Sequence, residues 1–408
     1  MMVMETIRCI KIGCYPTMDA NMSAKTKSDL MAKLRMRYVN AGPLHRTKLI
    51  DQAVELLGFH RKSAIRALNA PRKTQGEKTG KAGRPPKYDK ALLMEPLKMI
   101  WLKGQQPCGK RLVAMMKDWV PAYEAYYKSL GSGVKEQLLT ASSATLDRLL
   151  APLRAGLHPV SRPTRPGTIL RQEIPIRGGS WQENEPGWLE ADTVSLCGGS
   201  SSGEVIWMLD ATDICTGWVE LRAMYGRGQH AAVEQWAAIE QRLPFGWLGL
   251  DSDNGGEFMN YHVLAWCQKN RAEPIFYTRS RAYHSNDNAH VEQKNWTHVR
   301  QWFGYERHDN PEVAPLMNDL ASGELRLFQN MFSPSMKLEG KTRTKEGKEQ
   351  RKHSKARMPV ERVLESPKVT AERKAELLML KEKSNPFALE AAVQKKLREI
   401  DRVRRALE

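Results

Sequence analysis

The chain has 408 residues, of which 41% are hydrophobic, so it is long enough to bury more than one core. Its mean hydropathy is -0.55 and it contains no apolar run of about 18 residues, which excludes a helical membrane protein. Glu5, Arg8 and Lys11 interrupt the N-terminal segment, which argues against a signal peptide. We therefore expect a cytoplasmic protein, and the spacing of its six cysteines predicts neither a disulfide framework nor a zinc finger.

The net charge of +18 is distributed unevenly along the chain. Residues 1–150 carry 27 basic and 12 acidic side chains, residues 151–332 carry 16 and 22, and residues 333–408 carry 21 and 12. Basic ends indicate binding to a polyanion, whereas the acidic middle indicates that carboxylates serve another purpose there. The alternative is that the basic ends are only solvated surface.

The N-terminal segment, residues 1–70, has the pattern of a helix-turn-helix module. Apolar residues at helical spacing follow Arg46, Gly58 breaks the pattern, and a second helix begins at Arg61. The second helix of such a module can enter the major groove, where Arg61, Lys62 and Arg66 would contact DNA. A small helical bundle without DNA-binding activity would give the same pattern.

Two further segments extend this basic front. Residues 71–90 are rich in Lys, Arg, Gly and Pro and form a predicted linker. Within it, the step Gly83-Arg84-Pro85 resembles linkers that insert Arg into the minor groove of DNA; the alternative is a solvated tether. Residues 91–155 form a second predicted helical module, with Arg148 facing outward from its last helix. Two modules in series favour a bipartite DNA-binding region over packing alone.

A connector, residues 156–187, precedes a change from helical to strand patterns at residue 188. The expected order is three strands, then helix, strand, helix, strand and helix, which predicts an α/β domain with a mixed sheet over 188–310. The expected strands are 188–194, 205–211, 215–224, 246–253 and 273–278, and the expected helices are 229–243, 257–270 and 289–304.

Three carboxylates within these elements are candidates for a metal site. Asp192 interrupts an apolar strand, Asp253 lies at the carboxyl end of the fourth strand, and Glu292 lies one turn into the last helix. Clustered carboxylates suit Mg²⁺ or Mn²⁺, and two such ions can promote in-line displacement at phosphorus. Each also has a structural alternative: an ion pair for Asp192, a turn for Asp253 and a solvated helix face for Glu292. The other acidic residues nearby are Asp210, Asp213, Asp251 and Glu257, and Asp251 shares a strand face with Asp253.

Residues 188–304 resemble the catalytic core of retroviral integrases and bacterial insertion-sequence transposases, the Asp-Asp-Glu branch of the ribonuclease-H-like fold. The resemblance rests on Asp192 in WLEADTV, the TGWVE strand, Asp253 in DSDNGGEF and Glu292 in NDNAHVEQKN, with Asn295 one turn later. It implies a ribonuclease-H-like mixed sheet and a catalytic, metal-binding triad of Asp192, Asp253 and Glu292. The 38 residues between Asp253 and Glu292 slightly exceed the retroviral spacing.

The C-terminal region, residues 311–408, is basic and largely helical in its pattern. Residues 311–332 are expected to be helical and to close the core, and residues 336–357 form either a short β-hairpin or a flexible arm. Residues 368–408 form amphipathic helices that either self-associate or pack on the core.

The sequence therefore predicts a DNA transposase or integrase that binds the ends of a mobile element and inserts them into target DNA, with two Mg²⁺ or Mn²⁺ ions per active site. We expect it to be a homo-oligomer on double-stranded DNA, associated with the bacterial nucleoid, and not with membranes. The alternatives are an inactive DNA-binding regulator and an RNA/DNA-hybrid nuclease. Further candidate DNA contacts are Lys294 and the loop residues Arg279, Arg281, Tyr283 and His284.

Overall fold

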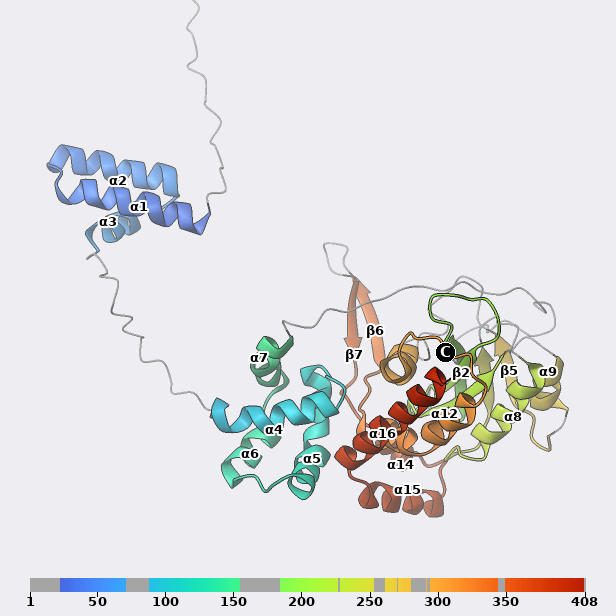
Figure 1. Cartoon of the computed structure of the whole chain (residues 1–408). Coiled ribbons are helices and arrows are strands. Elements are labelled where there is room, and N and C mark those ends of the chain that lie inside the picture. The colour runs from blue at the N-terminus through green and yellow to red at the C-terminus, as the bar shows by residue number, and fades with distance from the viewer. Residues whose placement is uncertain are drawn as a thin grey trace, which may run out of the picture. The chain divides into compact units, whose positions relative to one another are not determined.

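The computed structural model describes residues 23–70, 88–154, 184–226, 228–252, 261–269, 271–279, 291, 294–343 and 349–406. The chain divides into two compact units, residues 1–85 and 86–408 (Figure 1). The predicted linker, the connector and the loop after Arg279 lie mainly or wholly outside the described residues.

The first unit consists of three helices around a small core of its own. They are α1 (Ala24–Val39), α2 (Pro43–Leu57) and α3 (Arg61–Asn69). Gly58 ends α2 in the left-handed conformation, with φ of 69°, and its N–H donates to the carbonyl of Val54. Leu49, Ala53 and Leu68 are buried against α1, so the predicted helix, turn and helix are present and a further helix completes the bundle.

The second unit begins with four helices that pack against its C-terminal part. These are α4 (Lys90–Lys103), α5 (Gly109–Tyr126), α6 (Ser132–Thr140) and α7 (Ser143–Arg154). Trp119 of α5 is fully buried, and its indole N–H donates to the carbonyl of Phe332 at 3.2 Å. The ring of Trp119 also contacts the rings of Phe328 and Phe387. Residues 91–154 therefore share one hydrophobic core with the rest of this unit.

The centre of the second unit is a five-stranded mixed sheet in the order β3-β2-β1-β4-β5. β1 (Trp188–Ser195), β2 (Ile206–Asp213) and β3 (Val219–Tyr225) pair antiparallel, whereas β4 (Gly249–Ser252) and β5 (Phe276–Arg279) extend the sheet in parallel with β1. The strands are buried on both faces, which explains their apolar sequences. This strand order and orientation confirm the predicted ribonuclease-H-like α/β fold.

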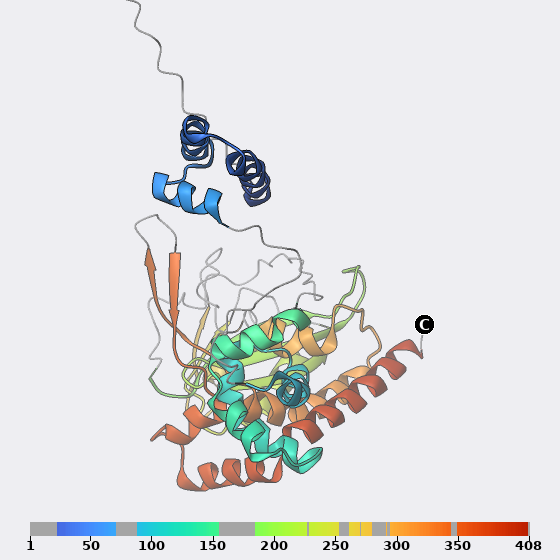
Figure 2. The same ribbon diagram turned by 90° about the vertical axis from the view of Figure 1, so that its left-hand side faces the viewer.

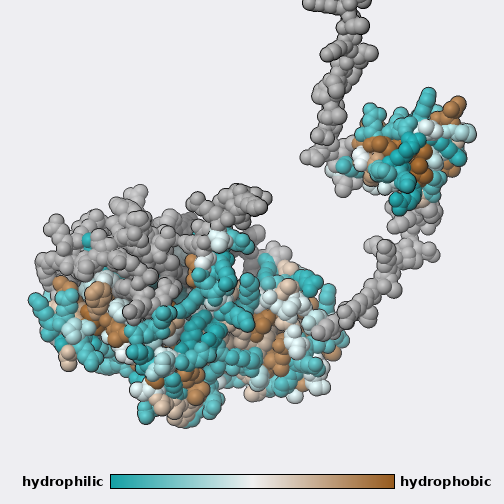
Figure 3. All heavy atoms as spheres, turned by 180° about the vertical axis from the view of Figure 1, so that it is seen from behind, coloured by the Kyte–Doolittle hydropathy of each residue, from teal (hydrophilic) through white to brown (hydrophobic). Residues whose placement is uncertain are grey.

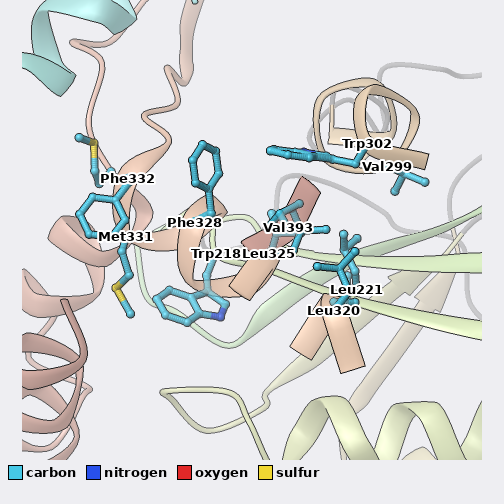
Figure 4. Packing of buried hydrophobic residues seen from close by; sticks show 14 of the residues in the cluster. Trp218, Leu221, Val299, Trp302, Leu320, Leu325, Phe328, Met331, Phe332 and Val393 are labelled. Carbon is cyan, nitrogen blue, oxygen red and sulfur yellow. The ribbon is translucent and has the colours of Figure 1, made fainter. Parts of the chain in front are cut away.

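Helices cover both faces and the edges of this sheet (Figure 1). α8 (Gln229–Glu240) and α12 (Val313–Ser322) pack on β3, while α9 (Tyr261–Gln268) packs on β5. A short helix α13 (Glu324–Leu327) leads into η2 (Phe328–Phe332), whose Phe328 meets Trp302 at 5.3 Å between ring centroids (Figure 4).

The predicted α-helix over 289–304 differs in the structure. Asn295–Arg300 forms a π-helix, η1, followed by a short α-helix α11 (Gln301–Phe303). A π-helix is wider than an α-helix, and such segments occur frequently at functional sites. The 3.6-residue spacing of apolar residues does not distinguish the two, so the sequence predicts only a helix here.

The C-terminal region contains a hairpin and three helices. β6 (Leu338–Arg343) and β7 (Glu349–His353) form an antiparallel hairpin that projects from the helices (Figures 1 and 2). The helices are α14 (Pro359–Glu365), α15 (Ala371–Lys383) and α16 (Pro386–Arg405). Val393 and Ile400 of α16 are buried, so this helix packs on the core of its own chain (Figure 4).

The described surface of the second unit that Figure 3 shows is mainly hydrophilic. On the face in Figure 3, hydrophobic side chains form small separate patches between hydrophilic ones. Among the described helices, none is both long enough and apolar enough to span a membrane.

Candidate active site

Asp192 lies in the middle of β1 on one face of the central sheet, and its carboxylate accepts hydrogen bonds from Asn295 and Thr193. The side-chain amide of Asn295, on η1, donates to Asp192 Oδ2 at 2.6 Å. The backbone N–H of Thr193 donates to Asp192 Oδ1 at 2.7 Å. These bonds orient the carboxylate, and carboxylate oxygens are ligands that hard cations prefer.

Asp210 lies directly opposite Asp192, because the two residues pair across β1 and β2. Its side chain is fully buried; Thr212 donates to Oδ1 at 3.0 Å, and Oδ2 has no hydrogen-bond partner among the described residues. Burial raises the pKa of Asp210 to about 8, and the charge of Asp192 acts in the same direction. The sequence offered Asp210 only as one of several nearby acids, although its strand position was predicted.

Lys294 supplies the opposite charge near Asp210. It is 6% exposed, and its Nζ lies 3.4 Å from the carbonyl of Gly217 and 3.4 Å from His298 Nε2. Burial lowers the pKa of Lys294 to about 7, whereas the negative charge of Asp210 opposes this change. Lys294 is therefore a buried neighbour of the candidate site.

The fourth strand brings another carboxylate to the same face. Asp251 pairs with Glu190 across β4 and β1, and the Thr278 hydroxyl donates to Asp251 Oδ1 at 2.5 Å. Glu190 and Asp192 are two residues apart on one strand, so their side chains share a face with Asp251. Asp253 lies outside the described residues; the described strand ends at Ser252, which pairs with Ala191.

Glu292 also lies outside the described residues, but its neighbour Val291 is described. The backbone N–H of Val291 donates to Glu190 Oε2 at 3.3 Å. Glu190 thereby connects the start of the segment that leads into η1 to the strand that carries Asp192. No cluster of three possible His, Cys, Asp or Glu ligands occurs within the described part of the chain.

Of the other acidic residues near the triad, Asp213 has a structural role. Its carboxylate accepts hydrogen bonds from the backbone N–H and hydroxyl of Thr216 and from the N–H of Gly187. The turn that follows contains Gly217 with φ of 72°, which favours glycine. Asp213 thus shapes the connection between β2 and β3. Glu257 lies outside the described residues.

Comparison with known proteins identifies a relative over most of the chain. The uncharacterized protein y4rM of Sinorhizobium fredii (strain NBRC 101917 / NGR234) is 34% identical over 330 residues, which cover 80% of this chain and 92% of the relative. The chain belongs to the same family as y4rM. No family model matches it.

Solved structures similar to this member of the y4rM family include two retroviral ones. The catalytic core domain of BIV integrase is 15% identical with a TM-score of 0.25, and the match covers 35% of this chain and 83% of that chain. The simian T-cell lymphotropic virus intasome, in complex with PP2A regulatory subunit B56 gamma, is 16% identical with a TM-score of 0.28. That match covers 52% of this chain and 68% of the other chain.

The predicted DNA contacts of the helical modules have different surroundings. Arg61, Lys62 and Arg66 are exposed on α3, where Arg61 forms an ion pair with Asp51. Arg148 is exposed on α7, and its guanidinium donates to the carbonyl of Ala144 at 3.2 Å. Arg279 is the last residue of β5 and is only 7% exposed. The sequence instead placed it in the loop that follows this strand. The remaining candidates, Arg84, Arg281, Tyr283 and His284, lie outside the described residues.

Proposed function

We propose that this member of the y4rM family is a DNA transposase or integrase that cuts at the ends of a mobile element and joins them to target DNA. The observation that carries the proposal is the oriented carboxylate of Asp192 in the middle of a ribonuclease-H-like sheet. The expected steps are attack of water at the element end, which frees a 3′-hydroxyl, and attack of that hydroxyl on a target phosphodiester.

Asp253 and Glu292 are proposed to complete the site with Asp192. Ser252, before Asp253, pairs with the residue before Asp192. Val291, before Glu292, donates to Glu190, two residues before Asp192. These links support the proposal that the three carboxylates belong to one site.

The proposed cofactor is Mg²⁺ or Mn²⁺, with two ions per active site. Carboxylate oxygens are the ligands that these hard cations prefer, and the partly buried Asp192 fits that donor chemistry. When bound, such ions activate an attacking oxygen and stabilise a leaving one. The role of this chain is to hold Asp192 in one orientation through Asn295 and Thr193.

The proposed partner is double-stranded DNA, both element ends and target DNA, bound by a homo-oligomer of the chain. Three exposed basic residues on α3 and the net charge of +18 support binding to a polyanion. The proposed domains follow the sequence prediction, with DNA-binding modules before residue 155 and the catalytic core in 188–310.

Asp210 favours a second candidate function, cleavage of RNA/DNA hybrids, because it places a fourth carboxylate beside Asp192. Its raised pKa argues against a charged, metal-binding form at neutral pH. The test is cleavage by the full chain, with Mn²⁺, of matched DNA duplex and RNA/DNA hybrid substrates. Transposase activity predicts cutting of element-end duplex, and exclusive cutting of the hybrid would overturn the proposal.

The element ends for this assay come from the DNA that flanks the gene. Inverted repeats bordered by short direct duplications are expected there, because strand transfer at staggered target positions duplicates the target sequence. The absence of such repeats around this gene and around the genes of its relatives would contradict the proposed function.

A further inference from the structure

A pocket of about 390 Å³ lies beside η1 within the second unit. It is lined by the loop between α4 and α5, by α5, by η1 and by the segment that follows η2. Asn295 contacts Asp192, whereas its neighbours Lys294 and Trp296 line the pocket. The volume is in the range of pockets that bind small organic ligands.

The charges at this pocket favour an anion. Arg111 of α5 and Lys294 both line it, and no acidic residue is among the described residues of its wall. Arg111 Nε is buried and has no hydrogen-bond partner within the described part of the chain. His298 also lines the pocket, with its Nε2 3.4 Å from Lys294 Nζ. Burial lowers the pKa of His298 well below its usual value, and the charges of Lys294 and Arg111 act in the same direction.

The rest of the wall suits a nucleobase. Trp296 is 47% exposed and lies 6.2 Å from Tyr305 between ring centroids, so an aromatic face is accessible beside the pocket. Gln105 and Gln106 also line the pocket, with φ of 65° and 54°, and Gln301 holds this loop by donating to the carbonyl of Gln105 at 3.1 Å. Aromatic rings stack on bases, and amide side chains can both donate to and accept from base edges.

We propose that this pocket binds one nucleotide of a DNA strand, with its phosphate at Arg111 and Lys294 and its base against Trp296 and the glutamines. The proposal rests on the proposed function, because it makes the pocket a DNA subsite on the same helical segment as the active site. A guanidinium suits a phosphate because its donors are arranged in a planar fork.

The test is photocrosslinking of the full chain to a duplex of arbitrary sequence with a short single-stranded 3′ extension containing 5-iodouracil. EDTA is present throughout, so that binding is measured without catalysis. We expect a crosslink to the peptide that contains Trp296. Arg111→Gln should reduce its yield by roughly tenfold, the loss expected for one charged contact. Crosslinks confined to other peptides would overturn the proposal.

Lys110→Gln is the matched control, since Lys110 is the adjacent residue, is exposed and loses the same charge. In the Lys110→Gln variant, the crosslink yield should stay within about twofold of that of the wild type, as expected for an exposed charge. An equal loss in both variants would show that only net charge matters and would overturn the proposal. Arg111→Lys keeps the charge, so recovery of the crosslink in that variant would exclude misfolding as the cause of the loss.

Competition then distinguishes a nucleotide from a bare anion. Deoxyadenosine monophosphate should displace the crosslinked strand at a lower concentration than inorganic phosphate, because only the former has a base for Trp296. Equal competition would reduce the pocket to a simple anion site and overturn the nucleotide assignment. If the crosslink is present but the chain never cuts DNA, the proposed function fails while the pocket stands.

Discussion

At the scale of single residues, the proposed role of Asp192 as a metal ligand leads to a prediction about catalysis. Asp192→Asn keeps the size of the side chain but removes its negative charge, so we expect strand transfer to fall by about 10³-fold or more. Binding to element-end DNA should change little, because the proposal makes Asp192 a metal ligand and not a DNA contact. The measurement is a gel assay of strand transfer beside a binding isotherm.

The same comparison tests the choice between Asp251 and Asp253. We expect Asp253→Asn and Glu292→Gln to abolish strand transfer, while Asp251→Asn retains it. Asp251 is fully buried and accepts a hydrogen bond from Thr278, which indicates a structural role. Activity that survives Asp253→Asn but not Asp251→Asn, in a variant shown to be folded, would reverse the assignment.

His308 gives a prediction about pH and stability. It is 4% exposed; burial lowers its pKa, and Arg404 acts in the same direction. A histidine whose pKa is lower in the folded state than its unfolded value of about 6.5 contributes stability at pH values above that unfolded pKa. This stability is lost as the pH falls, because the unfolded state then binds the proton more readily. In urea unfolding, His308→Phe should therefore lose less stability than the wild type between about pH 7.5 and pH 5.5.

The exposed His353 of β7 provides the control for this measurement. His353→Phe removes one exposed histidine and so serves as the comparison for the loss of the buried one. Identical pH dependence of the wild type and His308→Phe would show that burial of His308 does not contribute to acid sensitivity.

At the scale of elements, α3 is the proposed DNA-recognition helix. A fragment of residues 1–85 is a compact unit with its own core, so it can be studied alone. We expect it to bind duplex DNA with an affinity that falls steeply between about 50 and 200 mM salt, because phosphate contacts release counterions. Replacing Arg61, Lys62 and Arg66 with Gln should remove most of this binding, as measured by fluorescence anisotropy.

The control replaces three exposed lysines of α1, Lys25, Lys27 and Lys33, with Gln and so removes the same total charge. If α3 enters the groove, this variant should bind substantially more tightly than the α3 variant. Equal losses would indicate non-specific attraction to the basic unit, and salt-independent binding would contradict the electrostatic account.

The packing of α16 on α5 predicts that the C-terminal helix stabilises the second unit. Phe387 is 1% exposed and contacts the rings of Trp119, Tyr123 and Tyr127. Phe387→Ala should lower the free energy of unfolding by about 3–5 kcal/mol. Leu378→Ala, at a position that is 45% exposed, should change it by only about 0.5 kcal/mol. Similar effects of both substitutions in urea unfolding would contradict this packing.

The elements also show what the sequence can and cannot predict. Strands β1 and β2 were predicted within about two residues, because apolar runs between turn residues are a local signal. The sequence did not predict α1 or the π-helical geometry of η1. Nor did it resolve whether residues 368–408 pack on the core, because an apolar helix face indicates burial but does not identify its partner.

At the scale of the whole molecule, the sequence predicted the fold and the position of Asp192 within a strand, but not the surroundings of that residue. The order of strands and helices, with the motif resemblance, was enough for the ribonuclease-H-like sheet. The pairing of Asp192 with Asp210 depends on strand register, and the burial of Lys294 depends on tertiary packing. Neither property is local in the sequence, so both require the structure.

The central claim is that this chain joins DNA ends to target DNA by a metal-dependent reaction at Asp192. The most direct measurement incubates the full chain with element-end duplex and a supercoiled plasmid, with Mg²⁺ or Mn²⁺ or with EDTA. We expect joined products with the metal, none with EDTA, and a loss of at least about 10³-fold in Asp192→Asn. Joined products in EDTA, or undiminished joining by folded Asp192→Asn, would contradict the account.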